Sequence, residues 1–301
     1  MKKVIVTVGP ALFKDNILGN IQSASHIYRI NGSHGSISDI QESIHKIRKM
    51  ITNAEILIDL PGNKVRTTNL ESPIKVSSGE RIVLMAEQIG CSEFCSLVKA
   101  GDEILADDST LVFTVEEIDS KKVMLLSHSE GQLKNNKGMH VQGLSAQLPF
   151  LTQKDKDIIN LANEELITYV GLSFVRNVND IITAKELIGE NTQVIAKVET
   201  QAAVDNLNEI LKEVEYILID RGDLSTDVGL TKVPFYQKFI IEKALFWNRK
   251  VFLATQFLKY MEEKPIPSIA EVIDLYNTLK MGPPRKYGCT GSRRLETFWK
   301  C

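Results

Sequence analysis

The sequence predicts an α/β protein in which parallel strands form a (β/α)8 TIM-type barrel. Short, nearly continuous apolar runs alternate with amphipathic helical patterns in seven successive units, and such runs are typical of parallel strands that helices cover on both faces. The 301 residues are enough for a full barrel. Residues 70–147 lack helical periodicity and predict an inserted small β-barrel domain instead.

Three units precede this insert. Each begins with an apolar or β-branched run, and Gly9-Pro10 predicts a turn after the first run. The expected strands are residues 4–8, 25–30 and 55–60. The expected helices are residues 17–21 and a segment in which Ile40, Ile44, Ile47 and Ile51 recur at three- and four-residue steps.

Four further units follow the insert. Leu148-Pro149 marks the return to the barrel, and Thr152 is expected to cap a helix that begins near Lys154. The expected strands are residues 169–175, 194–198, 216–219 and 251–254, and the helices after them are residues 181–188, 204–211, 235–247 and 269–279.

The insert has the pattern of a β domain. Alternating runs at residues 81–85, 110–115 and 122–126 predict strands with one buried face. Because the insert follows the third barrel strand, we expect it to act as a lid over the catalytic end of the barrel. The expected organisation is a barrel domain of residues 1–69 and 148–282, a lid domain of residues 70–147, and an atypical tail of residues 283–301.

The tail does not fit the repeat. An eighth strand is due after Gly282, but the sequence continues with Pro283-Pro284, and proline removes the backbone donor that a central strand needs. We therefore expect a barrel that is incomplete at its eighth unit, with a truncated or frame-shifted end. The alternative is a divergent closing element.

The bulk composition excludes several classes of protein. A net charge of −2 argues against a nucleic-acid or membrane surface, and no apolar run approaches the roughly 18 residues of a membrane span. The N-terminal segment MKKVIVTVGP contains an apolar run that is too short for the hydrophobic region of a signal peptide. The four cysteines form no C-x-x-C pair, which argues against zinc or a disulfide framework and for a cytoplasmic location.

Polar residues follow the predicted strands at their carboxyl ends, where function lies in such a barrel. Glu199 and Asp223 are carboxylates at neighbouring strand ends, and carboxylates suit Mg²⁺ or Mn²⁺. Lys197 faces the same side of its strand as Glu199, so its ammonium is placed to stabilise a transferring phosphoryl group. The side chains expected at this mouth are Arg29, Arg66, Lys197, Glu199, Arg221, Asp223 and Thr255.

Other residues at these strand ends fit an anionic ligand: Gly222 allows close backbone approach to an anion, and Arg29 and Arg66 are natural phosphate clamps. Single features of this kind nevertheless have simpler explanations. Taken alone, a Lys-x-Glu pair is more often a surface ion pair, and His34 is more often an ordinary loop histidine. In the same way, Asp107-Asp108 is more often a solvated turn. Placement at several successive strand ends is what favours phosphoryl transfer.

A series of motifs follows in order along the chain: TVGPA at 7–11, RINGSHG at 29–35, LTQKDKDII at 151–159, GLSFVR at 171–176, AKVETQAAVDNLNEIL at 196–211, DRGDL at 220–224, ATQFL at 254–258 and PIPSIAEVIDLYN at 265–277. Together they resemble the pyruvate kinase family over nearly the whole chain to Gly282. Each piece alone is weak, but the ordered set is specific.

The resemblance implies transfer of the phosphoryl group of phosphoenolpyruvate to ADP, giving pyruvate and ATP in glycolysis. Glu199 and Asp223 would hold the metal, Lys197 would contact the phosphoryl group, and Thr255 would lie near the carbon that is protonated. The resemblance further implies catalysis by Arg29, substrate binding by Gly222, Asp223, Thr255 and Ser173, and nucleotide binding by Asn31, His34, Arg66, Asp108 and Lys137.

The sequence departs from the family at the monovalent-cation site. Asn31, Ser33 and Asp59 match the family's usual ligands of this cation. Leu60, however, replaces the usual threonine, and Lys64 replaces the usual glutamate. A fixed ammonium can supply the positive charge of K⁺. The combination of Leu60 and Lys64 resembles the potassium-independent branch of the family, so we expect that activity does not require K⁺.

Other departures concern the metal-binding loop and the end of the chain. Asp220 replaces the usual alanine, and Ser225 and Ala203 replace glycines. An added carboxylate would repel phosphoenolpyruvate or pair with an arginine. The family's C-terminal domain, which carries the effector site and part of the subunit interface, is absent from the sequence, so the interface of a homo-oligomer would be incomplete.

Two other functions stay open. One is a different phosphoenolpyruvate- or pyruvate-handling barrel enzyme such as a lyase, against which the lid and the Arg29–His34 nucleotide segment argue. The other is a catalytically impaired remnant or binding protein, which Asp220 and the tail favour.

Overall fold

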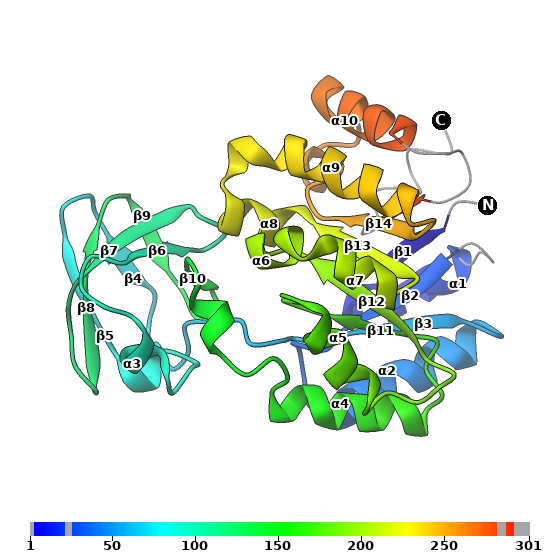
Figure 1. Cartoon of the computed structure of the whole chain (residues 1–301), viewed down its shortest axis with the longest axis horizontal. Helices are drawn as coiled ribbons and strands as arrows, with labels where there is room; N and C mark the ends of the chain where they lie inside the picture. Colours follow the sequence, from blue (N-terminus) through cyan, green and yellow to red (C-terminus); the bar gives the residue numbers. More distant parts are fainter. Residues whose placement is uncertain (1–2, 22–25, 282–286, 292–301) are drawn as a thin grey trace. The chain divides into compact units, whose positions relative to one another are not determined.

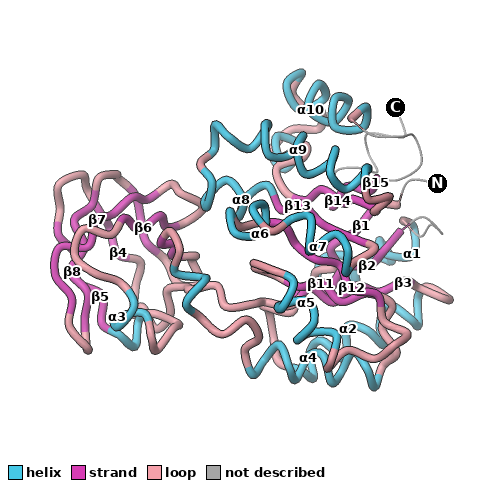
Figure 2. The backbone as a smooth tube through the Cα atoms, viewed as in Figure 1, coloured by secondary structure: helices cyan, strands magenta, loops and turns pink. Residues whose placement is uncertain are grey.

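The structure is a computed structural model that describes residues 3–21, 26–281 and 287–291 (Figure 1). The chain divides into two compact units. The first comprises Met1–Gly62, Phe150–Ser225 and Thr231–Cys301, and the second comprises Asn63–Pro149 with Thr226–Leu230. Figure 2 shows that strands and helices alternate in the first unit, whereas strands and loops dominate the second.

The first unit is a closed barrel of parallel strands in the order β1-β2-β3-β11-β12-β13-β14-β15. The predicted TIM-type barrel is confirmed, and each of the seven strands expected before Gly282 is present. The strands are β1 Val4–Thr7, β2 His26–Asn31, β3 Glu55–Asp59, β11 Tyr169–Leu172, β12 Gln193–Val198, β13 Tyr216–Asp220, β14 Lys250–Ala254 and β15 Tyr287–Gly291.

Apolar side chains fill the amino-terminal half of the barrel. Tyr169 and Tyr216 begin β11 and β13, and their rings meet edge to face with centroids 5.4 Å apart. Tyr216 also stacks on Phe252 of β14 at 6.2 Å. These rings fill the interior near the amino ends, whereas the buried charged side chains Asp59, Lys197 and Asp220 lie toward the carboxyl ends.

Helices that accompany the barrel strands follow the sequence pattern, with two exceptions. They are α1 Ile17–Asn20, α2 Ile37–Met50, α4 Gln153–Glu164, α5 Val178–Lys185, α6 Gln201–Asp205, α7 Leu207–Glu213, α8 Arg221–Val228, α9 Val233–Phe246 and α10 Ile269–Lys280, with 3-10 turns at η1 Pro10–Asn16, η4 Leu230–Lys232 and η5 Lys259–Glu262. Helix α8 was not predicted, because its sequence RGDLSTDV has no apolar stripe. Helices α6 and α7 stand where one helix was expected at residues 204–211. Thr152 caps α4 as predicted, in a capping box with Asp155.

Strand β15 corrects the prediction for the tail. It pairs with β14 on one side and β1 on the other, so the barrel is closed. The sequence of β15, YGCTG, contains no proline, so every residue of the strand has a backbone N–H to donate. Its pairing also provides hydrogen-bond partners for the edges of β1 and β14. Within the described residues the eighth unit consists of this strand alone, and the rest of the tail lies outside them.

The second unit is an all-β insert, as predicted. Its strands form two antiparallel sheets, ordered β10-β6-β7-β8-β5 and β4-β9, where the sequence predicted a small barrel. The elements are β4 Ile74–Val76, β5 Arg81–Met85, η2 Ala86–Gln88, α3 Phe94–Leu97, β6 Glu103–Ala106, β7 Leu111–Ile118, β8 Lys122–Ser127, β9 Gly131–Leu133, β10 Met139–Val141 and η3 Leu144–Gln147. Alternate residues of β7 and β8 are buried in the unit's own core, which includes Phe94 and Phe113.

The second unit begins at Asn63, somewhat before the expected Leu70. Isolated bridges join Arg66 to Gly138 and Thr67 to Ile89, so residues 63–69 pair with the insert rather than with the barrel. No helix in the described ranges has the length and apolar character that a membrane crossing requires.

We predict that Gly32→Ala destabilises the barrel unit. A Cβ at Gly32 would lie 2.7 Å from the Asp59 carbonyl oxygen and 2.9 Å from Ile158 Cδ1, so backbone and core must shift. Such overpacking costs about 1–3 kcal/mol, measurable by urea unfolding. The matched control is Gly9→Ala, where a Cβ meets nothing within 4 Å; a cost as large as that of Gly32→Ala would contradict the packing argument.

Candidate active site

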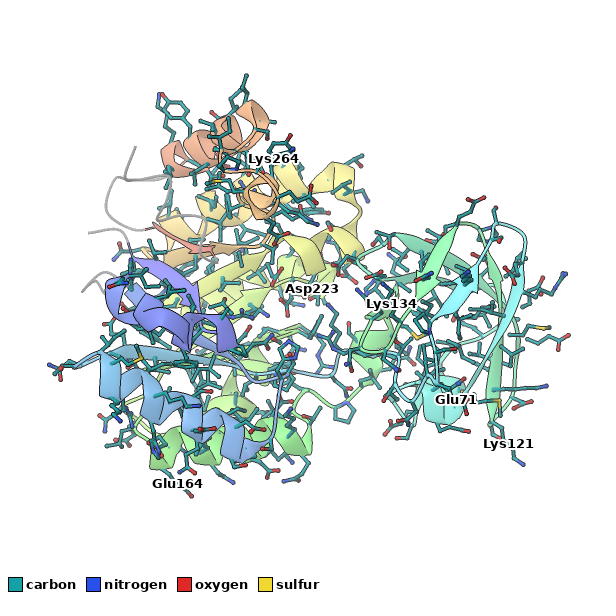
Figure 3. All side chains as sticks on the ribbon, turned by 180° about the vertical axis from the view of Figure 1, so that it is seen from behind. Glu71, Lys121, Lys134, Glu164, Asp223 and Lys264 are labelled. Carbon is teal, nitrogen blue, oxygen red and sulfur yellow. The ribbon has the colours of Figure 1, made fainter. Side chains whose placement is uncertain are left out.

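Charged side chains from several strands meet at the carboxyl end of the barrel. Asp59 ends β3 and Asp220 ends β13, while Arg29 and Lys197 lie near the ends of β2 and β12. The strands are parallel, so these ends share one side of the barrel. In Figure 3, Asp223 lies within the first unit, whereas Glu164, the last residue of α4, lies at its periphery.

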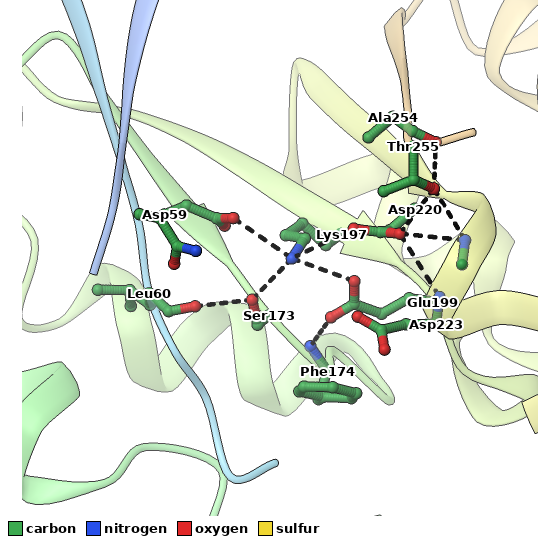
Figure 4. Close-up of polar contacts among 12 residues, drawn as sticks. Asp59, Leu60, Ser173, Phe174, Lys197, Glu199, Asp220, Asp223, Ala254 and Thr255 are labelled. Carbon is green, nitrogen blue, oxygen red and sulfur yellow. Dashed lines mark hydrogen bonds and ion pairs between the residues drawn. The ribbon is translucent and has the colours of Figure 1, made fainter. Parts of the chain in front are cut away.

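Lys197 is the centre of this group (Figure 4). Its Nζ donates to Ser173 Oγ at 2.9 Å and lies 3.5 Å from Asp59 Oδ2, 3.2 Å from Glu199 Oε2 and 3.9 Å from Asp220 Oδ2. The residue is 5% exposed, so the simpler explanation of a surface ion pair does not hold. Burial alone would lower the pKa of Lys197, but the three carboxylates outweigh burial and raise it.

Arg29 is fixed by two partners. Its guanidinium forms an ion pair with Asp59, and Nη1 donates to Thr7 Oγ1 at 3.0 Å. Burial would raise the pKa of Asp59, but Lys197 and Arg29 together hold it below its ordinary value. Asp59, predicted as a remnant of a cation site, is therefore the carboxylate that joins the two cationic side chains.

Glu199 is almost fully buried, with 1% exposure. Its Oε1 accepts the backbone N–H of Phe174 at 2.7 Å, and its Oε2 has no hydrogen-bond partner although the Lys197 ammonium is close. Burial, and then the charges of Asp223 and Asp220, raise the pKa of Glu199 to about 8 against the opposing effect of Lys197. A positive charge supplied at Oε2 would lower the free energy of the ionised form.

Three carboxylates form a cluster that can receive such a charge. One oxygen each from Glu199, Asp220 and Asp223 lie within 4.8 Å of one another. The sequence predicted Glu199 and Asp223 as metal ligands and singled out Asp220 only as a departure. Three hard oxygen donors at this spacing fit Mg²⁺ or Mn²⁺.

A second feature of Asp220 is its contact with the first turn of α8. Its Oδ1 lies 3.2 Å from Gly222 N and 3.5 Å from Asp223 N, both donors, and 3.2 Å from Thr255 Oγ1. Thr255 Oγ1 also accepts the Gly222 N–H at 2.9 Å. The side chain thus follows the pattern of a helix N-cap. The Thr255 hydroxyl lies beside it, and its shorter hydrogen bond goes to the Ala254 carbonyl oxygen at 2.7 Å.

Arg221 is directed away from this cluster. It forms an ion pair with Asp274 of α10 at 2.8 Å, donates to the Thr255 carbonyl oxygen at 3.0 Å, and lies over the Phe257 ring. The expectation that Arg221 adds charge to the mouth is therefore replaced by a structural role in holding the segment after β14.

Three of the residues with a strained backbone lie at strand ends around the site. Phe174, Thr255 and Gln256 adopt positive φ angles of 54°, 67° and 55°. Side chains other than glycine rarely occupy this region, and such strain is retained where surrounding structure enforces it. At Phe174 it directs the N–H toward Glu199, and at Thr255 it accompanies the contact with Asp220.

The nucleotide residues predicted from the barrel form a compact turn after β2. Asn31 Oδ1 accepts from Ser33 Oγ at 2.7 Å and Ser33 N at 3.1 Å. His34 is exposed and donates its backbone N–H to the Asn31 carbonyl at 3.3 Å. Their binding roles stay predictions.

The remaining predicted site residues belong to the second unit. Lys137 pairs with Asp107 at 2.6 Å, while the adjacent Asp108 is exposed with a φ of 55°. Arg66 donates to the Asn136 carbonyl at 3.1 Å, and Lys64 Cε lies 2.8 Å from where a Cβ of Gly138 would be. Their roles also stay predictions.

Fold and site together define a (β/α)8-barrel protein with an inserted β unit and a buried lysine–carboxylate centre at its strand ends. Residues 1–283 match the family model described as "Pyruvate kinase, barrel domain". The chain belongs to the pyruvate kinase family, and the resemblance seen in the sequence is confirmed.

Named relatives agree with this assignment. Proteins named pyruvate kinase from Thermotoga maritima, Borreliella burgdorferi and Geobacillus stearothermophilus are 32%, 29% and 31% identical to the chain over 295, 295 and 301 residues. The alignments cover 92%, 94% and 92% of this chain. They cover 63%, 62% and 51% of the relatives, so the chain spans between half and two-thirds of their length.

We predict that Lys197→Met destabilises the protein by about 3–5 kcal/mol, because it leaves buried carboxylates without their ammonium partner. The free energy of unfolding, measured in urea, checks this. Lys212→Met is the control, since Lys212 forms an exposed pair with Glu209 that is worth at most about 1 kcal/mol. Equal losses in the two variants would show that the buried charges do not depend on Lys197.

Proposed function

We propose that this chain catalyses the pyruvate kinase reaction. The phosphoryl group of phosphoenolpyruvate passes to ADP and, with uptake of one proton, the products are pyruvate and ATP. The single observation that carries the proposal is the buried Lys197 ammonium, 3.2 Å from a carboxylate of the Glu199–Asp220–Asp223 cluster. Family membership and the names of the relatives support it.

A divalent cation fits the charge of this site. When all four carboxyl groups of Asp59, Glu199, Asp220 and Asp223 are ionised, the two positive charges of Arg29 and Lys197 leave an excess of two negative charges, and the raised pKa of Glu199 reflects the cost of that excess without a cation. We propose that Glu199 and Asp223 hold Mg²⁺ or Mn²⁺. Bound there, the cation would act as a Lewis acid that neutralises charge on phosphoryl oxygens.

The protein's own residues have distinct tasks in this proposal. Lys197, whose orientation is set by Ser173 and Asp59, contributes a fixed ammonium toward the transferring phosphoryl group. Arg29, fixed by Asp59, holds a phosphate oxygen with its guanidinium. Gly222 and Asp223 present backbone N–H groups at the start of α8, and Thr255 places its hydroxyl beside the carbon that takes up the proton.

We propose that Asn31 and His34, on the turn after β2, contact ADP. In the second unit, we propose that Arg66, Asp108 and Lys137 are the nucleotide-binding residues and that this unit serves as the lid that the family implies. We further propose a cytoplasmic location and a homo-oligomer, as the family implies.

Potassium independence is part of the proposal. Leu60 offers no hydroxyl, and the ammonium of Lys64 stands in the sequence where the family usually has a glutamate, so it would supply the positive charge of K⁺. The second candidate function, a catalytically impaired binding protein, is favoured by the Asp220 carboxylate at the start of α8.

We predict that wild-type protein binds Mn²⁺ and that Glu199→Gln or Asp223→Asn weakens this binding by roughly tenfold or more, because each removes an anionic ligand. Calorimetry or electron paramagnetic resonance of Mn²⁺ measures the affinity. Glu209→Gln, which neutralises an exposed glutamate on α7, should leave it unchanged. Equal affinity in all four proteins would remove the metal from the proposal.

We predict pyruvate formation from phosphoenolpyruvate, ADP and Mg²⁺ at the same rate in K⁺ and in a K⁺-free buffer, measured with a coupled assay. The double variant Leu60→Thr/Lys64→Glu should become K⁺-dependent, because it restores the oxygen ligands of the family. A strong K⁺ requirement of the wild type would contradict the assignment of Lys64. No turnover under either condition would favour the binding protein.

A further inference from the structure

We propose that Lys154 is a positioning residue, whose ammonium holds the turn after β2 in the shape that the nucleotide site requires. The turn comprises residues 31–35 and carries Asn31 and His34, which the proposed function assigns to ADP. The inference rests on that proposed function and adds to it a residue of α4 that lies outside the lysine–carboxylate centre.

One ammonium group contacts two backbone carbonyls of this turn. Lys154 Nζ donates to the carbonyl oxygen of Gly35 at 3.0 Å and to that of Ser33 at 3.3 Å. Hydrogen bonds from a charged donor are stronger than those between neutral groups. The two contacts therefore restrain the turn from a helix that is distant in the sequence.

Hydrogen bonds within the turn centre on Asn31. Its Oδ1 accepts from Ser33 N and Ser33 Oγ, and its carbonyl oxygen accepts the His34 N–H. Gly35, at the end of the turn, has a positive φ of 75° and directly precedes Ser36, the cap of α2. Lys154 thus acts on the part of the turn where the backbone changes direction.

Helix stability does not account for a lysine at this position. Lys154 is the second residue of α4, and a cation in the first turn opposes the helix dipole. Its neighbours contact the same part of the barrel unit. Asp155 Oδ1 accepts the Gly62 N–H at 3.0 Å, and Ile158 Cδ1 lies 2.9 Å from where a Cβ of Gly32 would be. The start of α4 therefore contacts the segments that follow both β2 and β3.

Lys154 would act through the turn rather than on the ligand. Without the ammonium, the two carbonyls lose their charged donor, and residues 31–35 gain conformations in which the nucleotide-binding side chains are displaced. Ordering the turn on binding then costs conformational entropy, which weakens the affinity for ADP. A phosphate ester bound at the lysine–carboxylate centre uses other residues and is not affected.

The test compares Lys154→Met with Lys156→Met. Methionine retains an unbranched side chain and removes the charge, and Lys156 is the matched control because it is an exposed lysine on the same helix. Calorimetry at saturating Mn²⁺ measures the affinities of two probes. ADP reports on the turn, and 2-phosphoglycolate reports on the metal and phosphate site. Urea unfolding shows that each variant is folded.

We expect ADP to bind Lys154→Met about tenfold more weakly than the wild type, the equivalent of one hydrogen bond to a charged group. Lys156→Met should bind ADP as the wild type does, and 2-phosphoglycolate should bind all three proteins alike. Unchanged ADP affinity in Lys154→Met, or a parallel tenfold loss for 2-phosphoglycolate, would overturn the proposal. Should Lys154→Met fail to fold, Lys154→Gln, which is neutral but keeps a polar end, takes its place.

Failure of this inference is distinct from failure of the proposed function. Wild-type turnover of phosphoenolpyruvate, with the same KM for ADP in Lys154→Met, leaves the reaction standing and removes the role of Lys154. Tenfold weaker ADP binding by Lys154→Met in a chain without turnover supports that role and removes the reaction. Absence of ADP binding to the wild type removes the nucleotide site together with the role of Lys154.

Discussion

The candidate site depends on the buried ammonium group of Lys197. Asp59, Glu199 and Asp220 arrive from three different strands and would repel one another in a low-dielectric interior. Lys197 lies between them, within 3.2–3.9 Å of an oxygen of each, and Ser173 fixes its direction. The barrel brings these strand ends together, and the Lys197 ammonium offsets the electrostatic repulsion between their carboxylates.

The charges that remain support the proposal of a cation at this site. Arg29 and Lys197 offset only part of the carboxylate charge, and Glu199 has an oxygen without a hydrogen-bond partner. In the proposed function, such a site would repel an anionic substrate unless a divalent cation were bound first. The metal and the phosphate ester would then be coupled through the same few side chains.

Asp220 connects this cluster to the start of α8. One of its oxygens faces Lys197 and the other meets Gly222, Asp223 and Thr255. The Asp220 carboxylate therefore contributes both to the charge around Lys197 and to the hydrogen bonding at the start of α8. Of the lysine–carboxylate centre, the sequence predicted Lys197, Glu199 and Asp223 together, whereas it assigned Asp59 to the remnant of a monovalent-cation site.

The sequence by itself determined the seven strands before Gly282, the all-β insert, and the convergence of Lys197, Glu199 and Asp223, because period, burial and strand-end position are local properties of the chain. It did not predict β15, because strand formation there depends on the open edges of β1 and β14, nor α8, which has no apolar stripe. Only the tertiary structure decided that Asp59 joins Arg29 to Lys197, that Arg221 faces Asp274, and that Asp220 accepts backbone N–H groups at the start of α8. Those contacts join residues on different elements, and the direction of a side chain across such a junction is set by packing rather than by sequence pattern.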